Sequence, residues 1–202
     1  MMNKYLEKYP TLFIALVLAA AVVLSFLTVP PAHSATVLAA EAPAKPEKNP
    51  PGDIPDDQVF IDYRSAQGFS LKVPEGWARA EGPDGVSFTD KFNGVTVTIS
   101  SAASAPTVDS VKGDYRSTME QSRGAINVTD VRLVKLKGGS AVLISYSSNS
   151  EPNSVTNKQI RLENRRYLFF KDGRIAELDL FAPFGADNVD QWQLMSQSFR
   201  WL

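Results

Sequence analysis

The chain has 202 residues with no cysteine and one histidine, and its 21 basic and 22 acidic residues leave a net charge of −1. This length suits a leader followed by one domain of about 150 residues, or two very small domains. The lack of cysteine excludes disulfides, thiolate nucleophiles, Cys-ligated metal sites and a lipidated cysteine anchor. The balanced charge gives no overall attraction to nucleic acid or to an anionic membrane.

Residues 1–34 are typical of an export segment. Two lysines precede the apolar stretch 12–29, whose only polar members are one serine and one threonine. Small residues then suit cleavage by signal peptidase after Ser34 or after Ala42. The apolar stretch is longer than most signal cores and reaches the lower limit for spanning a bilayer. Either a cleaved signal peptide or an uncleaved anchor helix is therefore expected, and both place the rest of the chain on the extracytoplasmic side, in a periplasm, a lumen or the cell exterior.

Residues 35–58 form a proline-rich linker. Proline fixes φ and removes a backbone donor, so this segment is expected to be extended and semi-rigid. One interpretation is a spacer that holds the domain about 50 Å from a membrane; the other is a disordered mature N-terminus. The single histidine, His33, lies in the leader, so the predicted domain, 59–202, contains neither cysteine nor histidine.

Alternation of apolar and polar residues predicts strands from residue 59 onward. Asn93-Gly94 and Asp172-Gly173 are strong hairpin signals between neighbouring strands. The predicted strands cover 59–63, 69–73, 86–90, 95–99, 128–136, 141–146, 160–163, 167–170 and 175–181.

Two segments carry helical spacing of their apolar residues. The first begins at an N-cap, Thr107, and ends at Gly124; the second begins at Asp187 or Asn188 and runs to Phe199. Because the strands come in hairpins and do not alternate with helices, the sequence predicts an α+β domain with an antiparallel sheet and two main helices.

Several motifs, in the right order along the chain, resemble the PsbP-like domain family. Its opening is similar to residues 63–77, with the pattern Tyr-x4-Gly-Phe-Ser-Leu-x-Val-Pro-x-Gly-Trp. Its next hairpin is similar to 88–90 and 95–99, and its end to 172–173 and 196–199. The resemblance implies an antiparallel sheet flanked by helices, an α/β/α sandwich, here preceded by an N-terminal hydrophobic helix.

The resemblance also implies a function. Members of this family are exported or lie in the photosynthetic lumen, and they include an extrinsic subunit of photosystem II, assembly factors and envelope proteins. They are generally accessory or binding proteins and not enzymes. We therefore expect a membrane-tethered, non-enzymatic accessory or assembly subunit of a membrane protein complex. The alternative is a carrier that binds an amphiphilic ligand in a pocket between the sheet and the helices.

No catalytic, cofactor or metal site is predicted from the residues. No histidine is left in the domain to act as a base beside a serine, and metal or cofactor roles in the resembled family usually involve histidines. Acidic residues of possible catalytic or calcium-binding interest are better explained as turn residues and as solvent-exposed linker positions. They are Asp53, Asp56, Asp57, Glu75, Glu81, Asp84 and Asp90.

Charge is unevenly distributed, with a net charge of −5 over residues 53–90 and +4 over residues 158–174. The basic segment is the predicted partner-binding surface for the membrane complex. Its basic residues are Lys158, Arg161, Arg165, Arg166, Lys171 and Arg174. The alternative is a solvated face that protects edge strands from aggregation. No nucleic-acid partner is expected outside the cytoplasm.

Overall fold

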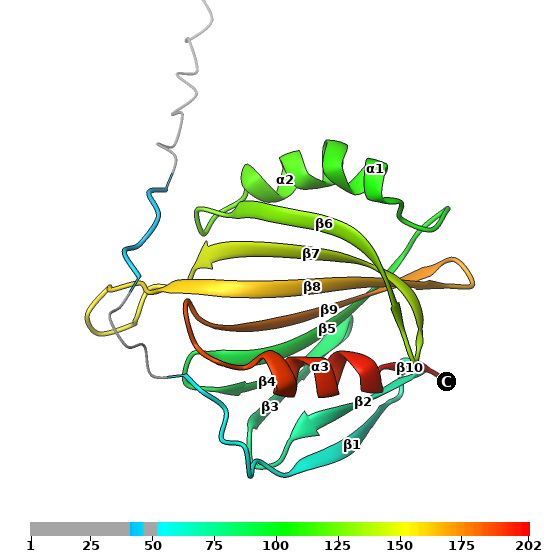
Figure 1. Ribbon diagram of the computed structural model, residues 1–202, viewed down its shortest axis with the longest axis horizontal. Helices are drawn as coiled ribbons and strands as arrows, with labels where there is room; N and C mark the ends of the chain where they lie inside the picture. Colours follow the sequence, from blue (N-terminus) through cyan, green and yellow to red (C-terminus); the bar gives the residue numbers. More distant parts are fainter. Residues whose placement is uncertain (1–40, 47–51) are drawn as a thin grey trace, which may run out of the picture. The chain divides into compact units, whose positions relative to one another are not determined.

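The computed structural model describes residues 41–46 and 52–202 (Figure 1). The predicted N-terminal hydrophobic helix, 12–29, lies outside the described residues. The same holds for Ala32, Ser34 and Ala40 of the two predicted cleavage motifs. No helix in the described part of the chain is long and apolar enough to cross a bilayer.

The main sheet has seven antiparallel strands in the order β3-β4-β5-β9-β8-β7-β6. These strands are β3 Ala78–Gly82, β4 Gly85–Asp90, β5 Asn93–Ser101, β6 Asn127–Leu136, β7 Gly139–Asn149, β8 Arg161–Lys171 and β9 Arg174–Pro183. A smaller antiparallel sheet has the order β1-β2-β10 and brings the two ends of the domain together. Its strands are β1 Phe60–Ser65, β2 Phe69–Pro74 and β10 Arg200–Trp201.

Helices lie on both faces of the main sheet (Figure 1). One face is covered by a continuous run of helical turns, and the other by α3 together with the small sheet. These elements are α1 Val108–Ser110, η1 Val111–Tyr115, α2 Arg116–Glu120 and α3 Val189–Ser198. The predicted α+β fold, an antiparallel sheet flanked by helices, is therefore confirmed.

Strand alternation divides the apolar residues of the main sheet between two cores. The larger core joins the main sheet, α3 and β2, and includes Phe169, Met195 and Phe69. The smaller core lies under α1 and α2 and includes Ile144 and Met119. Because residues that neighbour each other along a strand point to opposite faces, β8 supplies side chains to both cores.

Several predicted elements differ from the structure. The strands expected at 160–163 and 167–170 are one continuous strand, β8. The polar side chains of Asn164 and Arg166, which lie between the two predicted strands, form hydrogen bonds with neighbouring strands of the sheet. The helix expected from Thr107 to Gly124 is capped by Thr107, with a reciprocal capping box, but ends at Glu120. Its turns are interrupted at Gly113, whose ψ of −116° is not helical.

The described parts of the proline-rich segment lie against the domain. Ile54 is only 4% exposed and belongs to the larger core. Its backbone N–H donates to Oδ1 of Asn188 at 2.6 Å, and Nε2 of Gln191 donates to its carbonyl at 3.2 Å. The expectation of a free spacer therefore does not hold for residues 52–58, because the core of the domain takes up one of their side chains.

Candidate functional site

Arg166, one of the predicted partner-binding residues, has an internal role. Its Nε lies 2.8 Å from Oδ2 of Asp179 and its Nη1 lies 3.1 Å from Oε2 of Glu177, both on β9. Its Nη1 also donates to the hydroxyl of Tyr115 at 2.9 Å. Burial raises the pKa of Tyr115 to about 12, so this hydroxyl stays protonated and donates to Glu177. Arg166 therefore fastens the helical layer to the sheet.

Arg161 is also internal, at 7% exposure. Its guanidinium donates to Oδ1 of Asn149 at 3.0 Å, to Oγ of Ser147 at 2.6 Å and to the carbonyl of Ala125 at 2.8 Å. Burial lowers the pKa of Arg161. Its donors are used to hold the end of β7 and the loop before β6, so they are not available to a partner protein.

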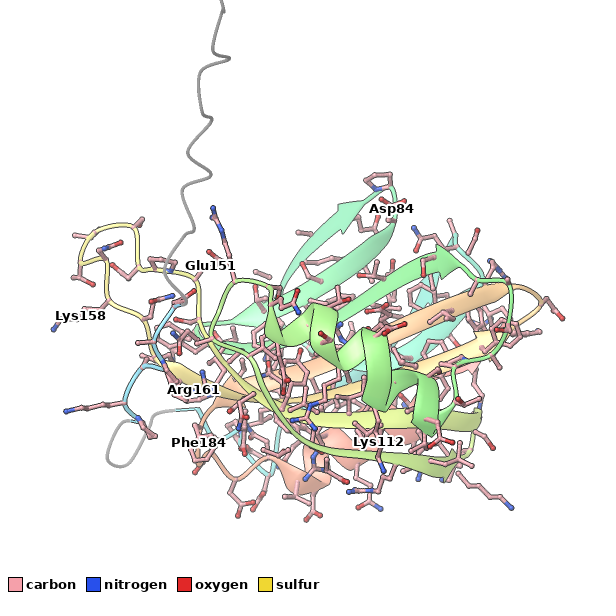
Figure 2. All side chains as sticks on the ribbon, turned by 90° about the horizontal axis from the view of Figure 1, so that it is seen from above. Asp84, Lys112, Glu151, Lys158, Arg161 and Phe184 are labelled. Atoms are coloured by element: carbon pink, nitrogen blue, oxygen red, sulfur yellow. The ribbon has the colours of Figure 1, made fainter. Side chains whose placement is uncertain are left out.

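Three other basic residues lie near the two ends of β8. Lys158 is exposed in the loop before β8, labelled in Figure 2, and Lys171 is exposed at the other end of the strand. Arg174 lies 4.9 Å from the centre of the Trp201 ring and donates to the carbonyl of Gln67 at 3.0 Å. The six basic residues of the predicted partner-binding surface therefore do not form one surface patch, because Arg161 and Arg166 are used inside the domain.

Arg165 differs from the other five basic residues in the environment of its charge. It is half-buried, and its guanidinium lies over the ring of Trp192, 5.4 Å from the ring centre. Within the described residues it has no carboxylate partner within 4 Å. An arginine held by an aromatic ring with its charge unpaired can bind an anionic or planar polar group at low entropic cost.

Two adjoining hollows surround Arg165. One has a volume of about 280 Å³ and the other of about 180 Å³, and Glu163, Arg165 and Trp192 line both. The first extends to the start of α3, and the second extends to Ser147 on β7. We call the residues around them the Arg165 surface: Glu163, Arg165, Phe184, Asp187, Val189 and Trp192.

The Arg165 surface combines charge with exposed apolar groups. Phe184 is 43% exposed and Val189 is 51% exposed, whereas Trp192 lies beneath them at 4%. Arginine, tryptophan and phenylalanine are enriched in the central parts of protein interfaces. This composition suits protein docking better than the binding of a small apolar ligand, since about half of each hollow's lining is charged or polar.

Glu163 adds an unpaired carboxyl group to this surface. Burial raises the pKa of Glu163; Arg165 opposes that shift and Asp187 reinforces it. Among the described residues Glu163 has no ion-pair partner, although β8 places it two residues from Arg165 on the same face. Charged groups that are kept partly buried without a partner are frequent at functional sites.

Sequence patterns identified only part of this surface. The sequence singled out Arg165 as a basic residue, but it favoured a core position for Trp192 and gave no role to Phe184. Only the turn between β9 and α3 brings Phe184 and Val189 beside β8. The described residues contain no group of three histidine, cysteine, aspartate or glutamate side chains placed to hold a metal ion.

No family model and no curated protein sequence matches the chain. The solution structure of cyanobacterial PsbP (CyanoP) from Synechocystis sp. PCC 6803 is similar, with a TM-score of 0.53, 14% identity, and coverage of 75% of this chain and 98% of that chain. LpqN of Mycobacterium tuberculosis, described as involved in cell envelope biogenesis, gives a TM-score of 0.43 at 12% identity over 72% of this chain and 91% of its own. The likeness to CyanoP confirms a PsbP-like fold and, at this identity, only the fold.

Proposed function

We propose that this chain is a membrane-tethered, extracytoplasmic accessory protein that docks on a membrane protein complex through the Arg165 surface. The observation that carries the proposal is the unpaired Arg165 on Trp192, flanked by the exposed Phe184 and Val189. The export leader and the PsbP-like fold support it, because the resembled family consists mainly of accessory proteins.

A binding role fits this surface better than catalysis. The surface offers Arg165 and Glu163, but the hydroxyl of Ser147 accepts a hydrogen bond from Arg161, and no hydrogen bond among the described residues joins it to Glu163, which lies opposite it in the register, or to another base. A serine nucleophile needs such a base to remove its proton. We therefore infer that the surface recognises a partner and does not transform a substrate.

The test is co-purification of the full chain from membranes solubilised in mild detergent. Arg165→Glu is expected to reduce the recovered partner at least about tenfold, since truncating a central interface arginine commonly costs 2 kcal/mol or more. Lys171→Glu makes the same charge change on the same strand, outside the Arg165 surface, and should leave recovery unchanged. Equal recovery with both variants would show that the Arg165 surface is not the docking site.

The same sample tests the tether. N-terminal sequencing of the recovered protein distinguishes cleavage after Ser34, cleavage after Ala42 and retention of the whole leader. We expect retention of residues 12–29 in protein that stays with the membrane, because the chain has no cysteine to carry a lipid anchor. A membrane-bound protein that lacks these residues would require another means of attachment.

The carrier alternative is not supported by the packing. The space between the main sheet, α3 and β2 is filled by Phe69, Phe169 and Phe199, each at most 1% exposed. The ring centres of Phe169 and Phe199 lie 4.3 Å apart, in a stacked arrangement. An amphiphilic ligand would have to displace these rings, so the pocket expected between sheet and helices is occupied by the protein itself.

A further inference from the structure

A short segment before the domain is held by a specific set of hydrogen bonds. The carboxylate of Glu41 accepts from Nδ2 of Asn149 at 2.8 Å, from Nε2 of Gln159 at 2.7 Å and from the backbone N–H of Gly124 at 2.8 Å. These bonds, that of Asn149 first, lower the pKa of Glu41. We call residues 41–44 the strap.

Asn149 is the residue to which the strap is bound. It is 7% exposed, and its Nδ2 donates to the carbonyl of Ala42 at 2.9 Å as well as to Glu41. Its Oδ1 accepts from the backbone N–H of Ala44 at 2.8 Å and from Arg161 at 3.0 Å. A buried asparagine whose donors and acceptor are all used in this way orients the strap as well as attaching it.

The strap site adjoins the Arg165 surface. Arg161 joins the two, because it donates both to Asn149 and to Ser147, and Ser147 lines one of the hollows around Arg165. The backbone N–H of Phe184 also donates to the carbonyl of Arg161, at 2.9 Å. In Figure 2, Arg161 and Phe184 lie towards the same end of the molecule as Glu151 and Lys158.

The strap also shortens the connection to the predicted anchor. Between an anchor that ends at Val29 and Glu41 there are 12 residues, 30–41, which reach at most about 40 Å when fully extended. Without the strap the next described point of attachment is Gly52, which raises the limit to about 80 Å. For a chain anchored by residues 12–29, as proposed above, the strap therefore halves the largest possible distance between the bilayer and the domain.

We propose that the strap holds the Arg165 surface towards the bilayer in which the chain is anchored, so that its partner is a membrane protein of that same bilayer with a docking face close to the lipid surface. This inference rests on the proposed membrane tether. It adds an orientation to the proposed function, and it restricts the partner to one that lies within reach of a short connection.

The lack of cysteine allows a direct measurement of this orientation. Val155→Cys places a label in the loop next to the strap site, at a position that is 89% exposed. Lys171→Cys places one on the last residue of β8, at the far end of a strand that is about 33 Å long. With the full chain in vesicles that contain acceptor-labelled lipid, energy transfer from residue 155 should clearly exceed that from residue 171.

Weakening the attachment of the strap should reduce this difference. Glu41→Ala removes all three hydrogen bonds to the carboxylate at an exposed position, so the fold is retained. Glu151→Ala is the matched control, since it removes an exposed carboxylate from the same end of the domain that has no hydrogen bond to the strap. We expect the two labels to become more alike in Glu41→Ala and to stay distinct in Glu151→Ala.

The outcomes separate this inference from the proposed function. A full chain that does not stay with the vesicles contradicts the tether itself. A chain that stays bound, with equal transfer from both labels while the strap is intact, overturns the orientation and leaves the docking proposal standing. If Glu41→Ala keeps the difference, Asn149→Ala provides the second test, with circular dichroism as the check on folding; a difference retained there as well rejects the strap as its cause.

Discussion

Arg166 and Asp179 form the least exposed ion pair among the described residues, with side chains 21% and 12% exposed and Nη2–Oδ2 at 2.7 Å. The hydroxyl of Tyr146 donates to the other oxygen of Asp179 at 2.9 Å, and burial raises the pKa of Tyr146. Such a pair gains little over apolar packing, because both charges lose their hydration. Removing only one partner of the pair, however, lowers the free energy of unfolding strongly, because the other charge stays buried.

Asp179→Ala should therefore lower the free energy of unfolding by about 3–5 kcal/mol, since it leaves Arg166 buried without its main counter-charge. Chemical denaturation of the full chain, followed by tryptophan fluorescence, measures this change. Asp62→Ala is the control: Asp62 pairs with Lys72 at 3.3 Å but is 75% exposed, and its loss should cost less than about 1 kcal/mol. Similar effects of the two substitutions would contradict the buried role of Asp179.

The contribution of Glu163 to the free energy of unfolding depends on pH in the opposite sense from that of a paired carboxylate. Because its pKa is raised in the folded protein, its charged form destabilises the fold at neutral pH. Glu163→Gln should therefore unfold at a higher denaturant concentration than the unaltered protein at pH 7. The difference should shrink as the pH falls through the raised pKa and vanish below the ordinary value for glutamate, where both states are protonated. If Glu163→Gln instead unfolded at a lower denaturant concentration than the unaltered protein at pH 7, Glu163 would have a stabilising partner.

At the scale of the elements, hairpin signals and alternation predicted most of the sheet. The Asp172-Gly173 turn has φ of +50° and +74°, the left-handed pair that such a hairpin requires. In contrast, β3 was missed because all five of its residues are exposed, so it has no buried face to produce alternation. The two-residue strand β10 is too short to carry any pattern.

The Arg165 surface could be predicted only in part, for a related reason. Alternation along β8 places Glu163 and Arg165 on one face and Arg166 on the other, but the sequence did not predict this, because it placed residues 164–166 between two strands. Which face carries a pairing carboxylate depends on β9, whose Asp179 lies opposite Arg166 in the register. That register, and the approach of Phe184 from the turn after β9, depend on tertiary packing.

At the scale of the whole molecule, the domain extends further towards the N-terminus than composition indicated. Proline content favoured a boundary at residue 59, but Ile54 fills part of the larger core. Ile54→Ala should lower the free energy of unfolding by about 2–5 kcal/mol, as for other buried isoleucines. Val59→Ala, at a position that is 57% exposed, should change it by less than about 0.5 kcal/mol in the same denaturation experiment. Equal, small effects would place residue 54 outside the cooperative unit.

The pairing of β2 with β10 has a consequence for the order of folding. Phe69 lies opposite Trp201 in the register, and the backbone N–H of Leu202 donates to the carbonyl of Gly68 at 2.9 Å. These partners are separated by about 130 residues, so closing the small sheet requires one of the longest loops in the domain and raises its contact order. The core around Phe69 and Phe199 can therefore be completed only after the last strand, β10, has paired with β2.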